Sequence, residues 1–447
     1  LALDMDAGSD VVNVDGISGA FELDIDGVTG SDTVTVTNTN LSGSSGNGLQ
    51  VANVTSLDVS GSTFSSNAQD GISATDAGAV VLSMVTAANN TSNGLALNGA
   101  SSLSITDGDY SGNTGIGIDV DDVLGSVTIT TPDATGNGGN GLDVAMSGNV
   151  TIDGGDYSGI AVTDVNSIFV GSTNVASTDD VLLEADNGVT IDAALNAGSS
   201  TVDISANQDG AGAEGFTMTA FSSIITTNDD AGAVVITTNT MAGTGTGEAR
   251  ISLISAGTTP GLSGGRVTVD ANGGAITDGN GILTNITAGN TILLSGDGVG
   301  SAADPIETNV SRLEGNSGNG GFYLSNRDAL TIGGIAMSRI GVMTTSGNLQ
   351  VQADGLLTVQ EDVSTTGGGD ILLKAVDAAT SGESLTVTTG VDITASNGNV
   401  DLQAGDDVTL IAGSHISASG SISITSDAMD ADAGTGTSLT IAAELDV

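Results

Sequence analysis

A four-residue phrase, glycine followed by apolar, any and apolar residues, recurs six times between Gly48 and Val162. A second phrase of apolar, any and apolar residues keeps step with it from Val34 to Val170. A repeat of this kind, with two or three alternating strands in each unit, is typical of a solenoid. The glycines of the first phrase recur at broadly similar intervals, which vary most in the last repeats, and are Gly48, Gly71, Gly94, Gly115, Gly141 and Gly159.

This periodicity predicts an all-β, parallel β-helix in which one repeat of about 22 to 23 residues forms one coil. Each short strand would pair with its equivalent in the next coil. The flanking apolar residues of each phrase would point inward and the middle residue outward. A glycine before the first strand predicts a corner with a positive φ. No single coil buries enough apolar surface to be stable alone, so we expect the stack to supply the stability.

Asparagines form a further column with the same period. They recur at an almost constant interval, at Asn67, Asn90, Asn113 and Asn137. Stacked amides can hydrogen-bond along the axis of a strand assembly, as they do in other stacked-strand structures. The column therefore predicts an amide ladder at one corner of the coils.

Two parts of the chain resemble known protein families. The units from Asn89 to Leu97 and from Asn113 to Val120 resemble the repeats of right-handed parallel β-helices of the pectate-lyase-like type, over roughly residues 10 to 175. From about Gly264 the chain resembles the repeats of bacterial surface and secreted proteins of the filamentous haemagglutinin and autotransporter-passenger types. The resemblance implies a single-stranded right-handed β-helix and an extracellular or cell-surface location.

Regularity of the repeat predicts four segments. Regular β-helix repeats are expected in residues 1–175 and irregular coils in 176–299. Less repetitive coils with a loop excursion are expected in 300–346, and haemagglutinin-like repeats in 347–447. The chain starts and stops in mid-pattern, which favours a segment of a longer polypeptide.

Charge and composition restrict the partners. The chain has 54 acidic and six basic residues, a net charge of −48, and its first 249 residues contain neither lysine nor arginine. Phosphate-backbone binding requires cations, so we expect no nucleic-acid partner. Cysteine is absent, which excludes disulfides and thiolate metal sites. No apolar run is long enough to cross a bilayer, so we expect no membrane insertion in this segment.

Acidic residues are the candidate metal ligands. Asp119, Asp121 and Asp122 lie at an expected coil corner, where carboxylates and backbone carbonyls suit the flexible coordination of calcium. Stacking also brings like charges of adjacent coils within about 5 Å, so counter-ions should reduce their repulsion. The alternative is that these acids form a solvated surface. No other cofactor is expected.

Catalytic constellations are not evident in the sequence. Gly261-Leu262-Ser263-Gly264-Gly265 matches a nucleophile-elbow pattern, but the single histidine, His415, is expected at an exposed strand end. A groove with basic and aromatic residues could come only from residues 300 to 340. Its members would be Arg312, Phe322, Tyr323, Arg327 and Arg339. We therefore expect no catalytic residues and no enzyme.

The preferred hypothesis is a structural or adhesive rod segment of a large bacterial cell-surface or secreted protein, forming a stalk, fibre or surface layer. Expected partners are further copies of the chain, a host cell or a polysaccharide. The alternative hypothesis is a carbohydrate-active β-helix enzyme that acts on extracellular polysaccharide.

Overall fold

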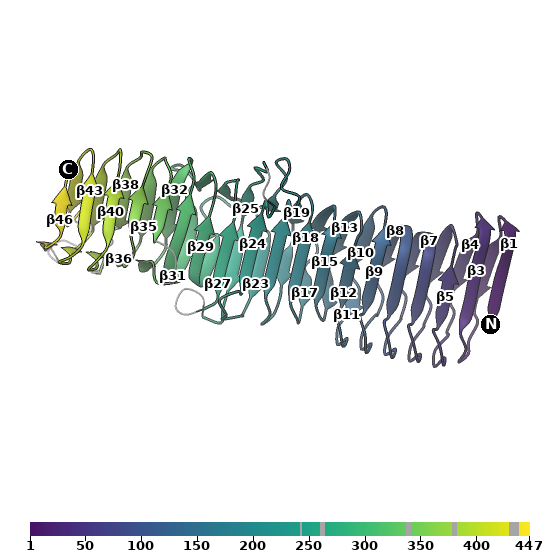
Figure 1. The fold of residues 1–447 in the computed structure, drawn as a ribbon. Coiled ribbons are helices and arrows are strands. Elements are labelled where there is room, and N and C mark those ends of the chain that lie inside the picture. The colour runs from purple at the N-terminus through teal and green to yellow at the C-terminus, as the bar shows by residue number, and fades with distance from the viewer. Residues whose placement is uncertain (242–243, 260–263, 337–340, 378–381, 429–437) are drawn as a thin grey trace. The chain divides into compact units, whose positions relative to one another are not determined.

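The computed structural model describes residues 1–447 apart from 242–243, 260–263, 337–340, 378–381 and 429–437. Every element of regular secondary structure in the described residues is a β-strand (Figure 1). The chain forms two compact units, Leu1–Ile204 and Ser205–Val447.

Strands of the first unit form three parallel lines that run from coil to coil, and in the third line the first coils contribute isolated bridges in place of strands. The first line contains β1 (Ala2–Gly8), β3 (Leu23–Gly30), β5 (Leu49–Ala52), β7 (Ile72–Ser83), β8 (Leu95–Thr106), β9 (Ile118–Val123), β12 (Leu142–Ala145), β15 (Ile160–Val165) and β18 (Val181–Ala185). The second contains β2 (Val11–Asp15), β4 (Thr33–Thr37), β6 (Ser56–Ser60), the second halves of β7 and β8, β10 (Val127–Thr130), β13 (Asn149–Asp153), β16 (Ser167–Val170) and β19 (Val189–Ile191). The third contains β11 (Asp133–Ala134), β14 (Gly155–Tyr157), β17 (Val175–Ser177) and β20 (Ala194–Asn196).

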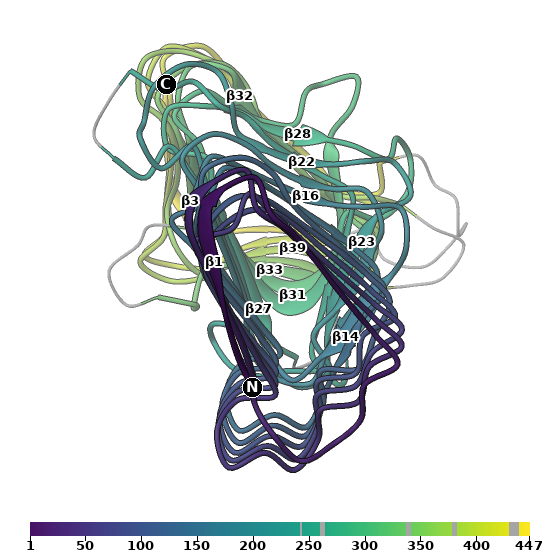
Figure 2. The same ribbon diagram turned by 90° about the vertical axis from the view of Figure 1, so that its right-hand side faces the viewer.

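Equivalent residues of successive coils lie in register. Figure 2 shows the coils of the first unit one behind another, so that equivalent strands and corners superpose. The register produces stacked columns of aliphatic residues inside the coils, where each fully buried aliphatic side chain contributes about 1.5–3 kcal/mol. The clearest buried column is Leu49, Ile72, Leu95, Ile118, Leu142 and Ile160.

The predicted asparagine ladder is confirmed. Asn90 is 1% exposed, and its Oδ1 accepts a hydrogen bond of 2.9 Å from the backbone N–H of Asn67. The Oδ1 of Asn113 in turn accepts from the Asn90 backbone N–H at 2.8 Å and from Asn90 Nδ2 at 3.1 Å. Asn137 repeats both bonds to Asn113. The ladder therefore satisfies buried backbone donors at a corner where no strand partner is available.

The predicted reason for the phrase glycines is wrong. Gly48, Gly71 and Gly94 have no positive φ. They are required for close approach instead: a Cβ on Gly71 would lie 2.7 Å from the carbonyl oxygen of Gly94 and 2.8 Å from Asn90 Nδ2. Positive φ angles occur elsewhere, in columns at the corners. One such column is Asn53, Asp76, Gly99 and Asp122, with φ of 56°, 49°, 78° and 56°.

One glycine of the predicted phrase does not belong to the column. The sequence phrase begins at Gly115, but in the structure Ile118 pairs with Leu95, and Gly117 donates its N–H to the carbonyl of Asn140. Gly117 therefore takes the place of Gly94 in the next coil. Ile116 is part of the corner, where its N–H donates to Asn93 Oδ1 at 2.8 Å.

Strands of the second unit again pair in parallel. One line contains β24 (Val234–Thr238), β27 (Arg266–Asp270), β29 (Ile286–Leu294) and β31 (Ile306–Ser317), and a second contains β22 (Phe216–Met218), β25 (Ala249–Ile251), β28 (Ile276–Asp278), β30 (Gly298–Val299), β32 (Gly321–Asn326), β35 (Leu349–Ala353), β38 (Ile371–Ala375), β41 (Val400–Ala404) and β44 (Ile422–Thr425). A third begins with β23 (Ser223–Thr226) and β26 (Leu253–Ala256), while β21 (Val202–Ala206) contains the boundary between the units.

The strand lines of the second unit rearrange at β31 and β32. The line of β23 and β26 continues through the first parts of β29 and β31. It then merges with the line of β28 and β30, because β32 pairs with both β30 and the first part of β31. The last part of β31 pairs with both β33 and β34, so one line becomes two. The two resulting lines are β33 (Leu330–Ile332), β36 (Leu357–Val359), β39 (Leu385–Val387), β42 (Val408–Leu410) and β45 (Leu439–Ile441), and β34 (Val342–Thr344), β37 (Val363–Thr365), β40 (Asp392–Ala395), β43 (His415–Ala418) and β46 (Glu444–Asp446).

The predicted fold class is confirmed. Over the residues that the structure describes, both units are all-β, right-handed parallel β-solenoids, with about 18 turns of about 23 residues in all. Inward positions alternate with outward ones along each strand. The outward residues form rows whose side chains do not pack in the core, so the core does not restrict their residue types.

Candidate functional site

Strand β9 positions the acidic residues that the sequence singles out. Asp119 and Asp121 alternate with the buried Ile118 and Val120, so both carboxylates point outward on one face. Asp122 follows in the left-handed region, with a φ of 56°, and turns the corner. The expected corner position is therefore wrong for Asp119 and Asp121, which share a face of a strand because they alternate with core residues, and holds for Asp122 alone.

Neighbouring coils bring further carboxylates to Asp119. Asp143 of β12 is its register partner in the next coil. Partial burial, and then the charges of Asp143, Asp121 and Asp70 in that order, raise the pKa of Asp119 to about 6. Asn93 opposes this by donating from Nδ2 to Asp119 Oδ2 at 2.9 Å. The acidic site is therefore spread along the axis, over Asp70, Asp119, Asp121 and Asp143.

Spacing of these carboxylates decides how a cation could be held. In the described ranges of the chain, no group of three or more His, Cys, Asp or Glu side chains has the spacing of a metal site. Calcium binding at Asp119, Asp121 and Asp122 therefore stays a prediction.

Asp122 instead lines a groove of about 530 Å³ that follows the corner between β7, β8 and β9. Asp76 lies two coils earlier on the same groove, and Gly78 and Gly99 also line it. Leu124 is a further lining residue and is 84% exposed. The groove offers carboxylates and apolar surface together, which suits a cationic ligand with an apolar part.

A second groove, of about 400 Å³, crosses four coils of the second unit beside β35, β38 and β41. Its edge is a polar ladder in which Asn348 Oδ1 accepts from Asp370 N–H at 3.0 Å and Asp370 Oδ1 accepts from Asn399 N–H at 2.8 Å. Gln350 and Asp401 add an amide and a carboxylate to its lining. Side chains of this kind can hydrogen-bond the hydroxyls of a sugar chain.

The structure contains a carboxylate cluster, Asp278, Asp304 and Glu307, that was not predicted from the sequence. Asp278 ends β28, and Asp304 and Glu307 come from the next coil. Burial and then the charge of Asp278 raise the pKa of Glu307 to about 7, and Asp304 adds to the effect. Burial and Asp278 also raise the pKa of Asp304, while Arg250 lowers it. Perturbed carboxyl groups of this kind concentrate at functional sites.

Stability should depend on the ionisation of Glu307. Its pKa is higher in the folded chain than its ordinary value of 4.5, so folding favours the protonated form. The stabilisation is complete below about pH 4.5 and is lost as the pH rises through about 7. We expect the free energy of unfolding to fall between pH 5 and pH 8, and Glu307→Gln to flatten this slope in urea titrations. The exposed Glu214 is the control: Glu214→Gln should keep the wild-type slope. A wild-type slope in Glu307→Gln would contradict the assignment.

Two residues of the expected basic groove are not available to line one. Phe322 is completely buried in the core, so it cannot line a groove. Arg312 donates from Nη1 to the carbonyl of Gly333 at 3.0 Å and to Gln360 Oε1 at 3.1 Å, which occupies it within the fold. Arg339 lies outside the described residues, whereas Tyr323 and Arg327 are at least partly exposed. The inward alternation of β32 explains why Phe322 fails as a ligand-binding residue.

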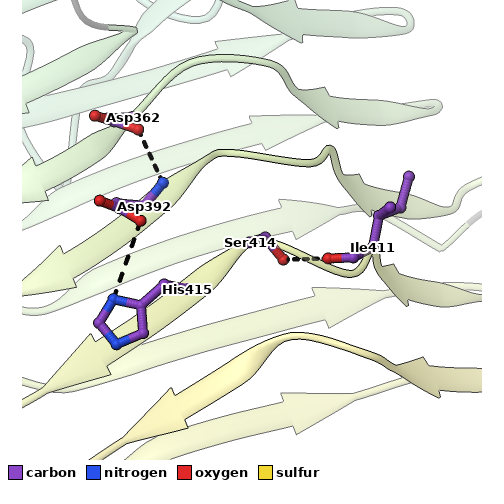
Figure 3. A network of polar contacts seen from close by, with 5 residues as sticks. All are labelled: Asp362, Asp392, Ile411, Ser414 and His415. Carbon is purple, nitrogen blue, oxygen red and sulfur yellow. Dashed lines mark hydrogen bonds and ion pairs between the residues drawn. The ribbon is translucent and has the colours of Figure 1, made fainter.

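Ser414, His415 and Asp392 lie close together, as Figure 3 shows. His415 Nδ1 is 4.0 Å from Asp392 Oδ1, and Asp392 donates its N–H to Asp362 Oδ1 at 2.8 Å. The Ser414 hydroxyl, however, points away from the imidazole and donates to the carbonyl of Ile411 at 2.7 Å. The serine and the histidine therefore form no nucleophile and base pair here. Residues 261–263 of the other serine motif lie outside the described residues.

Sequence reasoning missed the Asp278 cluster because its members do not follow the coil period. Asp304 and Glu307 follow Asp278 at intervals longer than one coil. The intervals are longer because residues 279–285 form a loop between β28 and β29. The available signal was the presence of Asp304 and Glu307 on either side of Pro305. These two acids could not be placed beside Asp278 before the lengths of the coils were known.

Residues 27–156 match the family model of the right handed beta helix region. This match covers β-strands of the first unit, including β9 and the groove with Asp122. It agrees with the right-handed β-helix resemblance of the sequence. Comparisons with curated proteins and with solved structures find no match. No helix of the described residues has the length and apolar character to span a membrane.

Proposed function

We propose that the chain is a structural and adhesive segment of a bacterial cell-surface or secreted protein, where it contributes to a stalk, fibre or surface layer. The observation that carries this proposal is the continuous in-register pairing of coils in each unit. Such pairing fixes the backbone over long stretches and arrays outward side chains in rows. A scaffold of this kind suits display and assembly, including association between copies.

Adhesion is assigned to the groove beside β35, β38 and β41. Amide, carboxylate and hydroxyl groups project there from Gln350, Asp401 and Ser423. Several weak contacts repeated along the groove suit a polysaccharide, whose hydroxyls repeat as well. The site carries no step of catalysis in this proposal.

A polysaccharide panel tests the proposal. We expect the purified chain to retain at least one extracellular polysaccharide without releasing reducing ends, and Gln350→Ala with Ser423→Ala to weaken retention several-fold. Ser73→Ala, at an outward position of the first unit, is the matched control and should change nothing. Unchanged retention by the double variant would contradict the assigned groove.

A carbohydrate-active enzyme is the second candidate, and a specific observation favours it. Burial and the charge of Asp278 raise the pKa of Glu307 to about 7, so Glu307 can keep its proton near neutrality beside a second carboxyl group. Glycosidases use a carboxyl group with a raised pKa as the acid of such a pair. Release of reducing ends by the wild type, and its loss in Glu307→Gln, would replace the structural proposal with this one.

Calcium is proposed to bind the acidic row at Asp119 and Asp121. Their repulsion with Asp143 raises the free energy of the folded chain, and a divalent cation would offset it. We expect millimolar calcium to raise the melting temperature relative to chelator at matched ionic strength. Asp119→Asn should reduce this rise, whereas Asp179→Asn, at another corner, should retain it. Equal melting temperatures in calcium and chelator would leave non-specific screening as the whole effect.

A further inference from the structure

Four apolar side chains are exposed at one corner of the second unit, in three successive coils. Phe221 precedes β23 and is 95% exposed, and Leu253 begins β26. Ile282, which is 92% exposed, and Leu283 lie in the loop before β29. Pairing of β23 with β26 and of β26 with β29 stacks these corners along the axis. Exposed apolar residues that gather in this way mark interaction sites, unlike single scattered ones.

Hydrogen bonds hold the loop that presents Ile282 and Leu283. At its start, Gly279 donates its N–H to the carbonyl of Ile251 at 2.7 Å. At its end, the buried Asn285 donates from Nδ2 to Asp278 Oδ1 at 2.6 Å. The two apolar side chains therefore project from an anchored loop, which lowers the entropic cost of covering them.

Carboxylates flank the apolar side chains. Asp278 is joined to the loop by Asn285, and Asp304 and Glu307 lie close enough to Asp278 for their charges to repel. Within the described part of the chain, Arg250 is the cation that acts on this group, through Asp304. Above the pH at which Glu307 ionises, three acids against one base leave a negative rim, which attracts cationic groups and repels phosphates and anionic lipid.

We propose that this corner surface docks a polypeptide segment in which lysine or arginine residues alternate with apolar ones. The corner surface consists of Phe221, Leu253, Ile282, Leu283, Asp278, Asp304 and Glu307. Apolar side chains of the partner would cover Phe221 and Ile282, and its cations would neutralise the carboxylates. Charge complementarity selects this occupant over a nucleic acid, a membrane or a second acidic copy.

A labelled synthetic peptide that repeats leucine and lysine is the probe, with fluorescence anisotropy as the readout. We expect saturable one-to-one binding to the full chain. Phe221→Ser with Ile282→Ser should weaken it at least tenfold. Met84→Ser with Met146→Ser removes two exposed apolar side chains of the first unit that line none of the grooves described above, and is the matched control, which should bind as the wild type does.

A peptide that repeats serine and lysine separates charge from apolar contact. It should bind more weakly and should not distinguish the Phe221 and Ile282 variant from the wild type. Asp278→Asn with Asp304→Asn should weaken the leucine and lysine peptide, whereas Asp179→Asn with Asp180→Asn should not. The proposal is overturned by no saturable binding, by equal loss in both apolar variants, or by equal affinity for the two peptides. Sedimentation that shows a wild-type dimer abolished by Phe221→Ser with Ile282→Ser would also overturn it, since the occupant would be a second copy.

Discussion

Gly94→Val is expected to lower the free energy of unfolding by about 3 kcal/mol, at the upper end of the cost of overpacking a core. A Cβ on Gly94 would lie 2.5 Å from the carbonyl oxygen of Gly117, 2.7 Å from that of Ala87 and 2.8 Å from Asn113 Nδ2. None of these atoms can rotate away, because the oxygens belong to the backbone of packed coils and the amide belongs to the ladder. Urea denaturation of the purified chain measures the change.

Gly8→Val is the matched control in the same unit. A Cβ on Gly8 would meet nothing within 4 Å, and this glycine has no positive φ. Its replacement should change the free energy of unfolding by less than about 0.5 kcal/mol, as for other surface substitutions. Equal effects of the two substitutions would show that the glycine of the repeat is not required for close approach.

Asn90→Ala should be nearly as damaging, with a loss of about 3 kcal/mol in the free energy of unfolding. The side chain is buried, and the substitution leaves the Asn67 N–H without its acceptor and Asn113 Oδ1 without one donor. A buried donor with no partner costs about 1–3 kcal/mol, and the loss of the second hydrogen bond and the cavity add to this.

Hydrogen exchange separates this explanation from simple loss of packing. The amide proton of Asn67 should exchange faster in Asn90→Ala by more than the global loss of stability requires. Asn98→Ala, at an exposed outward position of the neighbouring strand, is the control and should leave both stability and exchange unchanged. An Asn67 amide that stays protected in Asn90→Ala would mean that the ladder bond does not hold this corner.

Much of the fold follows from period and alternation. The coil length, the inward apolar pairs such as Leu49 and Val51, and the Asn67 to Asn137 ladder are all predicted from sequence and are confirmed. They are predictable because stacking forces equivalent positions of each coil into the same environment. The same residue type therefore recurs at the same interval.

Features that depend on where coils touch are not predictable in this way. Gly115 and Gly117 both fit the phrase, and only the pairing of Ile118 with Leu95 decides between them. The sequence pattern assigns the glycine of the repeat to a positive φ, whereas the structure shows that it prevents a clash with the next coil. Local sequence cannot tell these two uses of glycine apart, because both require only that the Cβ be absent.

Candidate sites divide along the same line. The sequence shows that the chain is acidic and that Asp119, Asp121 and Asp122 lie close together along it, where a coil corner was expected. The folded structure places Asp119 and Asp121 on β9 and determines which acids meet: Asp143 stacks on Asp119, and Asp304 and Glu307 reach Asp278. The reason is that a pKa shift or a docking surface depends on distances between coils. Loops of different length set those distances without leaving a fixed interval in the sequence.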